Sequence, residues 1–148
     1  MGNPIGPVIA NIFMVELECT IVPTMNNILV EWMRYVDDTF TFVKKGELNK
    51  VLDTLNSFHG DIKFTHEMEE ERSIPFLDVR VERKEDCTFT TSIYRKKTSS
   101  DVYIHWNSFA PRTWKVGTLH NLLQRAFTTC SDESKLEEEI QYLLSSPK

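Results

Sequence analysis

The chain has 148 residues, of which 41% are hydrophobic and 26% are charged, a mix typical of a globular protein with a real core. Its net charge of −5 excludes a protein that is basic throughout. The charge is uneven, because residues 1–86 sum to −7, residues 87–130 to +5 and residues 131–148 to −3. The positive charge is therefore concentrated in one block.

Sequence signals for export or membrane insertion are not evident. We find no apolar run of the length of a transmembrane helix, and the first residues lack the basic region of a signal peptide. The three cysteines are odd in number and lack zinc-ligand spacing. We therefore expect reduced thiols in an intracellular protein, of the nucleus or the cytoplasm, with no membrane partner.

The first predicted elements are a loop and a helix. Residues 2–7 are rich in glycine and proline, and the apolar run after them predicts a helix over residues 7–20. A glycine-rich loop that opens a helix lets a nucleotide or a template strand approach the backbone closely. The alternative is a plain loop before a core helix. We expect exposed apolar surface on this helix around Ile9, Ile12, Phe13 and Leu17.

Residues 29–44 predict a β-hairpin with Asp37 and Asp38 at or near its turn, because β-prone apolar residues flank the two acids on both sides. Adjacent carboxylates repel each other, and aspartate is depleted in sheets. A divalent cation removes this conflict, since Mg²⁺ prefers a few carboxylates together with phosphate oxygens. The alternative is a solvated turn, for which paired aspartates are common.

The remaining elements follow from hydrophobic periodicity and turn residues. Residues 47–58 predict an amphipathic helix, and residues 96–101 a basic loop. Ser131 is a candidate cap for the last helix. Strands are predicted over residues 62–69, 74–83 and 87–94, and the two C-terminal helices over residues 113–129 and 132–144.

Basic and aromatic residues alternate in the positive block. Such a surface suits a nucleic-acid backbone with bases stacked on the rings. The alternatives are a solvated basic face over core aromatics, or a surface for another protein. The basic members are Arg95, Lys96, Lys97, Arg112, Lys115 and Arg125, and the aromatic members are Tyr94, Tyr103, Trp106 and Trp114.

Two motifs resemble those of reverse transcriptases. The box Tyr35-Val36-Asp37-Asp38 resembles their catalytic box, and the first seven residues resemble the loop before it, usually Met-Gly-Ser-Pro-Leu-Ser-Pro. Asn3 and Gly6 here replace the two serines, which puts hydroxyl contacts to the template in doubt. The later segments 62–67, 74–79, 90–96 and 103–108 extend the likeness in order over nearly the whole chain. Together they resemble the palm and thumb region of Penelope-like retroelement reverse transcriptases.

This resemblance implies an α+β fold. Residues 1–97 would form a partial palm, an antiparallel sheet with packed helices, and residues 98–148 a helical thumb or helix-turn-helix pair. An ordinary helical hairpin is the alternative for the latter. Asp37 would be a catalytic ligand of Mg²⁺ or Mn²⁺, with Asp38 beside it. The resemblance places Gly2, Asn3, Pro4, Tyr35, Val36 and, more weakly, Lys63 near the nucleotide or primer terminus, and Phe76 and Leu77 in a primer-gripping hairpin.

Parts of that family's active site are expected upstream of this chain. A further catalytic aspartate and the fingers precede the glycine-proline loop in the family, and this chain starts at the loop. We therefore expect it to need an upstream segment before it can copy an RNA template from a DNA primer with deoxynucleoside triphosphates. The alternatives are a non-catalytic nucleic-acid-binding remnant and a helical interaction module.

Overall fold

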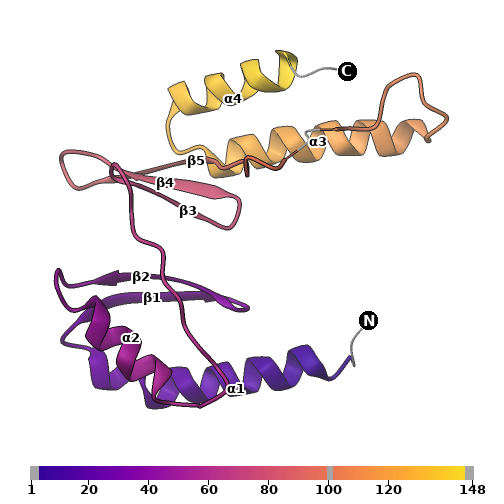
Figure 1. Ribbon diagram of the computed structural model, residues 1–148. Helices are drawn as coiled ribbons and strands as arrows, with labels where there is room; N and C mark the ends of the chain where they lie inside the picture. Colours follow the sequence, from indigo (N-terminus) through magenta and orange to yellow (C-terminus); the bar gives the residue numbers. More distant parts are fainter. Residues whose placement is uncertain (1–3, 100–101, 146–148) are drawn as a thin grey trace. The chain divides into compact units, whose positions relative to one another are not determined.

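The computed structural model describes residues 4–99 and 102–145, and the chain divides into two compact units, Met1–Glu67 and Met68–Lys148 (Figure 1). The fold is α+β, as predicted, with two small antiparallel sheets and four α-helices in the described residues. The boundary between the units lies after residue 67, whereas the sequence suggested a division after residue 97. The sheet of the second unit thus groups with the C-terminal helices.

The first unit packs two helices against a hairpin. Its elements are α1 (Gly6–Thr20), the 3₁₀ turn η1 (Val22–Met25), β1 (Leu29–Tyr35), β2 (Asp38–Val43) and α2 (Leu48–Asn56). In Figure 1, α1 runs along the β1–β2 hairpin. Helix α2 turns Val51 and Leu55, spaced four residues apart, toward the core. The buried core consists of Leu17, Met25, Ile28, Leu29, Val51 and Leu55.

Helix α1 carries apolar side chains on more than one face. Leu17 is buried, so the expectation that it is exposed was wrong, because it belongs to the core cluster. Phe13 also packs against that cluster. The outer face remains apolar and exposed, as predicted for Ile9 and Ile12, and comprises Ile5, Val8, Ile9, Ile12 and Val15.

The segment Gly6–Met25 is long and apolar enough to cross a membrane, by length and composition only. The expectation that no run reaches that length was therefore wrong, because this stretch holds only the two charged residues Glu16 and Glu18. Within the first unit the segment contributes Leu17 and Met25 to the core. Core helices of folded domains have the same composition, so the length of the segment does not assign it to a membrane.

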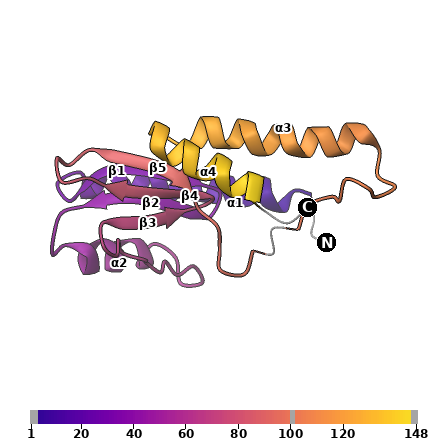
Figure 2. The ribbon, with the colours of Figure 1, turned by 90° about the horizontal axis from the view of Figure 1, so that it is seen from above.

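The second unit combines a three-stranded sheet with two helices. Strands β3 (Ser73–Phe76), β4 (Val79–Arg83) and β5 (Phe89–Ile93) pair antiparallel in that order. Helices α3 (Arg112–Thr129) and α4 (Glu133–Ser145) follow. Figures 1 and 2 both show α4 beside the C-terminal half of α3, with the N-terminal half of α3 extending past it. Ala126 of α3 is fully buried.

Three predicted features differ from the structure. Residues 62–69 are irregular, because the Asn56 side chain, not a neighbouring strand, satisfies the backbone of Phe64: Phe64 N–H donates to Asn56 Oδ1 (2.6 Å), and Asn56 Nδ2 donates to the Phe64 carbonyl (3.3 Å). The strand predicted over residues 74–83 is two strands, β3 and β4, joined by a turn. Ser131, the predicted cap, instead accepts a hydrogen bond from Thr91 N–H (2.9 Å).

Candidate functional site

The two acids of the first hairpin lie at its turn, as the sequence predicted. Tyr35 pairs with Asp38 at the end of the ladder, so Val36 and Asp37 form a two-residue turn. Val36 has φ +56°, in the left-handed region. For a β-branched residue this is a genuine outlier, and the left-handed region disfavours side chains with a Cβ by about 1–2 kcal/mol. The turn therefore holds strain directly before the two exposed carboxylates.

Backbone strain at this turn leads to a stability prediction. Val36→Gly is expected to raise the free energy of unfolding by about 0.5–1 kcal/mol, because relief of the left-handed conformation outweighs the entropy of glycine. Val30→Gly, at an exposed position of β1 without positive φ, should lower it by about 1 kcal/mol. Urea denaturation of both variants measures the difference. A loss of stability in Val36→Gly equal to that in Val30→Gly would show that the Val36 side chain makes a stabilising contact.

Asp37 and Asp38 are both exposed. Within residues 4–99 and 102–145, no group of three histidine, cysteine, aspartate or glutamate side chains is placed to hold a metal ion. A two-metal site needs more ligands than two neighbouring carboxylates. In the described part of the chain, the two carboxylates therefore have no third ligand grouped with them.

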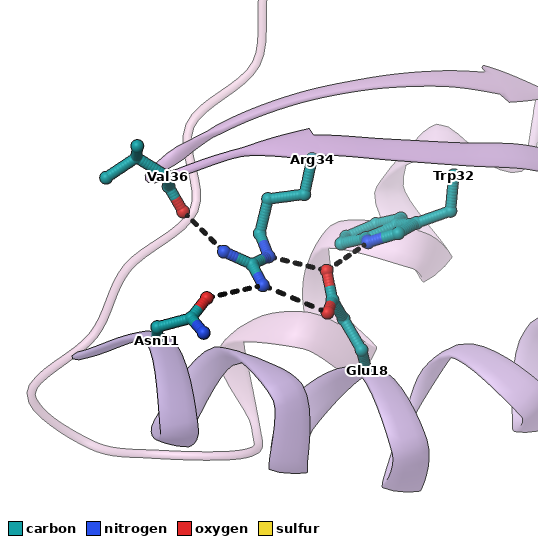
Figure 3. Close-up of polar contacts among 5 residues, drawn as sticks. All are labelled: Asn11, Glu18, Trp32, Arg34 and Val36. Atoms are coloured by element: carbon teal, nitrogen blue, oxygen red, sulfur yellow. Dashed lines mark hydrogen bonds and ion pairs between the residues drawn. The ribbon is translucent and has the colours of Figure 1, made fainter. Parts of the chain in front are cut away.

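A side-chain clamp fixes the hairpin to α1 (Figure 3). Arg34 Nε and Nη2 donate to the two carboxylate oxygens of Glu18, at 2.6 and 3.2 Å. Trp32 Nε1 donates to the same carboxylate at 2.9 Å. Arg34 also reaches the turn, since Nη1 donates to the Val36 carbonyl (2.9 Å), and Nη2 donates to Asn11 Oδ1 (3.2 Å). The strained turn is therefore tied to the helix that follows the glycine-proline loop.

The clamp is charged and partly buried. The side chains of Arg34 and Glu18 are only 12% and 24% exposed. The hydrogen bond from Arg34, helped by that from Trp32, lowers the pKa of Glu18 despite an opposing effect of burial. Sequence analysis missed Glu18, Asn11 and Arg34. The available signal was that Trp32 and Arg34 occupy alternate positions of one strand and so share a face.

The second hairpin has a similar turn. Phe76 pairs with Val79, and Leu77, at the first turn position, has φ +56°. Asp78 follows it, as Asp37 follows Val36. The Asp78 carboxylate lies 3.8 Å from Arg125 Nη2, and its carbonyl accepts from Tyr94 N–H (2.8 Å). Asp78 is therefore a turn residue whose carboxylate lies near a cation of α3.

The other predicted nucleotide-site residues lie at the surface or outside the described residues. Pro4 is exposed, and Lys63 is exposed in the irregular segment after α2. Tyr35 and Val36 are exposed at the hairpin turn. Gly2 and Asn3 lie outside the described residues. The structure therefore places Tyr35 and Val36 beside the acids.

The predicted basic residues have different surroundings. Arg95 is paired with Glu139: Nη1 donates to Oε2 at 2.7 Å, Nη2 donates to Oε1, and the guanidinium lies 4.0 Å from the centre of the Tyr142 ring. Lys115 Nζ donates to the Trp106 carbonyl (2.5 Å) and the Ser108 carbonyl (2.6 Å). Both cations are therefore engaged in contacts within the second unit. The exposed cations are Lys96, Lys97 and Arg112, and Arg125 is half-buried.

A cavity of about 470 Å³ lies in the second unit. It is lined from the end of β5, from α3 and from α4. Its charged lining residues are Asp78, Arg95, Lys96, Arg125 and Glu139, and the rings of Tyr94 and Tyr103 also contribute. Because two acids face three cations there, the cavity is mixed in charge. Of the cations, Arg95 is paired with Glu139, and Arg125 lies 3.8 Å from Asp78.

One comparison with known proteins gives a match in the C-terminal part. Residues 102–145 match the family described as the animal helix-turn-helix domain. This range contains α3 and α4 and the segment before them. Neither a curated protein nor a solved structure matches the chain. The second unit therefore ends in a helix-turn-helix-like segment, and this likeness suggests nucleic-acid binding.

Proposed function

We propose that this chain is part of the RNA-directed DNA polymerase of a retroelement, related to the Penelope-like reverse transcriptases. The first hairpin would belong to a palm, and the C-terminal unit would bind nucleic acid. The helix-turn-helix match supports the second statement in its general form. The likeness of the sequence motifs and the geometry of the hairpin support the first.

The observation that carries the proposal is the clamped, strained turn with two adjacent carboxylates. Strained backbone that the surrounding structure maintains is concentrated at functional sites. Here Arg34 donates hydrogen bonds to the Val36 carbonyl and to Glu18, which fixes the backbone of the turn to α1. Asp37 and Asp38 are exposed to solvent. The second hairpin has a similar strained turn, but the paired carboxylates are found only in the first of these two turns.

Roles follow from this arrangement. Asp37 would bind Mg²⁺ or Mn²⁺, Asp38 would assist, and Tyr35 and Val36 would flank the primer terminus. Gly2, Asn3 and Pro4 would lie near the incoming nucleotide. A divalent ion would neutralise charge on the reacting phosphate. Since the described residues offer only part of its ligands, an upstream segment would supply the rest, and this chain alone would bind the ion weakly.

Paramagnetic Mn²⁺ provides the test. Added Mn²⁺ is expected to broaden the amide NMR signals of residues 35–39 first, and Asp37→Asn with Asp38→Asn should abolish this. Glu85→Gln with Asp86→Asn removes another adjacent acidic pair, exposed in the second unit, and should leave the broadening unchanged. Equal broadening at both acidic pairs in the wild-type chain would overturn the metal role of the hairpin.

Primer extension on an RNA template with Mg²⁺ complements this test. We expect no extension by the chain alone, and none by Asp37→Ala. Extension by the wild-type chain that Asp37→Ala abolishes would show that a further acid or a second copy completes the site. Extension by both proteins would exclude Asp37 from catalysis.

A second candidate function is a non-catalytic module that binds nucleic acid through its C-terminal unit. The helix-turn-helix match favours it, because that match includes none of the hairpin residues. Retained nucleic-acid binding without preferential Mn²⁺ broadening at Asp37 and Asp38 would support this function over the first.

A further inference from the structure

The two C-terminal helices differ in charge. Residues 102–130, which include α3, contain Arg112, Lys115 and Arg125 and no aspartate or glutamate. Helix α4 contains four glutamates and one lysine. A phosphate backbone is attracted to the first stretch and repelled by the second.

Helix α4 uses one side to bind the sheet. Glu139 pairs with Arg95, Lys135 Nζ lies 3.5 Å from Glu82 Oε2, and Asp132, just before the helix, accepts from Lys84 Nζ at 3.0 Å. Its outer side keeps three exposed glutamates, Glu133, Glu137 and Glu138. In DNA-binding helix-turn-helix proteins the second helix enters the major groove. Here that geometry would bring these carboxylates toward the phosphates.

Helix α3 offers the opposite surface. Its N-terminal half extends past α4 in Figures 1 and 2. Trp114 there is 64% exposed, and Trp106 in the preceding segment is 56% exposed. Phe109, in that segment, and Arg112, in the first turn of the helix, are also exposed.

Lys115 orders this surface. Its two hydrogen bonds to the Trp106 and Ser108 carbonyls fix the preceding segment against α3, and its Nζ lies 5.8 Å from the centre of the Trp106 ring. The aromatic side chains are therefore presented from a fixed backbone. Preorganisation of this kind lowers the entropy lost on binding.

We infer that residues 106–109 and the N-terminal half of α3, and not α4, bind single-stranded nucleic acid. Unpaired bases would stack on Trp106, Phe109 and Trp114, and the backbone would lie near Arg112. Stacking needs bases that are free of a duplex, which favours a single strand as the ligand. This inference rests on the proposal that the C-terminal unit binds nucleic acid, and it specifies the surface and the ligand.

Fluorescence anisotropy with the full chain tests the inference. The probes are a labelled oligouridylate of about 12 nucleotides and an RNA duplex of the same length. The single strand is expected to bind more tightly, and its affinity to fall as salt rises. Trp114→Ala and Trp106→Ala should each weaken it about tenfold, in line with the loss of one stacked base. Arg112→Gln should weaken it less.

Matched controls identify the surface. Glu137→Gln with Glu138→Gln alters α4 only and should not weaken binding of the single strand. Phe127→Ala removes an exposed aromatic ring from the other end of α3 and should leave it unchanged. Amide NMR spectra of each variant verify that the unit remains folded. A loss of affinity in Phe127→Ala equal to that in Trp114→Ala would overturn the location of the surface.

The other outcomes separate this inference from the proposed function. Preferred binding of the duplex that Trp114→Ala leaves unchanged would overturn the inference and leave nucleic-acid binding intact. Failure to bind either probe would overturn both this inference and the proposal that the C-terminal unit binds nucleic acid. Asp37 lies in the other unit, so the Asp37→Asn variant should retain nucleic-acid binding whatever the result of the Mn²⁺ experiment.

Discussion

Glu139→Ala is expected to destabilise the second unit by about 3 kcal/mol, because it removes the more deeply buried partner of a two-bonded ion pair, and breaking a buried pair is strongly destabilising. The Glu139 side chain is 8% exposed, and that of its partner Arg95 is 23% exposed. Arg95 lies just after β5, whereas Glu139 belongs to α4. The substitution therefore removes a principal contact between this helix and the end of the sheet.

Urea denaturation followed by the amide NMR signals of α3 and α4 measures this effect. Glu138→Ala is the matched control, since the neighbouring glutamate is exposed and its nearest cation, Lys135, lies 3.8 Å away. It should change the free energy of unfolding by less than about 0.5 kcal/mol. An equally small effect of Glu139→Ala would show that α4 is held by other contacts.

A double substitution separates the contribution of the ion pair to stability from the contribution of buried apolar volume. Arg95→Met with Glu139→Leu removes both charges and keeps apolar volume, so we expect it to destabilise less than Glu139→Ala alone. The guanidinium also contacts the Tyr142 ring, and methionine can retain part of that contact. A double variant less stable than Glu139→Ala would indicate that the ion pair stabilises the folded unit more than apolar side chains at the same two positions do.

Local patterns were sufficient to predict most elements. The β-prone apolar residues on both sides of Asp37 and Asp38 predicted the first hairpin, and the helical spacing of residues 113–129 predicted α3 within one residue at its start. Both depend on neighbours in sequence. The irregular segment after α2 shows the limit, because its alternation favoured a strand but the backbone of Phe64 is hydrogen-bonded to a side chain.

Contacts between distant residues could not be predicted. Arg34 and Glu18 are 16 residues apart, and Arg95 and Glu139 are 44 apart. Counting charges placed Arg95 among the nucleic-acid contacts, since a sum over residues ignores which charges are paired. The same count correctly showed that residues 87–130 are positive, and the structure then separated the exposed cation Arg112 from the structural cations Arg95 and Lys115.

The positive φ angles in the two hairpin turns also could not be predicted from the sequence. Type II′ turns favour glycine at the first position, yet this chain has Val36 and Leu77 there. A turn prediction from glycine and asparagine would have missed both. The first of these turns is the one that Arg34 holds, which connects the strain at the candidate site to a specific contact.

Glu18→Gln is expected to destabilise the first unit by about 2 kcal/mol at neutral pH, because it replaces charged hydrogen bonds to Arg34 and Trp32 with weaker ones in a partly exposed site. The effect should depend on pH. The pKa of Glu18 is lower in the folded chain than its ordinary value of 4.5. Its contribution is therefore present above about pH 4.5 and lost as the pH falls through the folded pKa.

Denaturation of the wild type and of Glu18→Gln between neutral pH and acid measures this difference, which should shrink below pH 4.5. Glu16→Gln, at an exposed position of the same helix, should give no such difference. Because Arg34 also holds the Val36 carbonyl, loosening the clamp should weaken the Mn²⁺ broadening at Asp37 and Asp38 as well. A Glu18→Gln variant that loses stability but keeps full broadening would show that the clamp stabilises the fold without positioning the two acids.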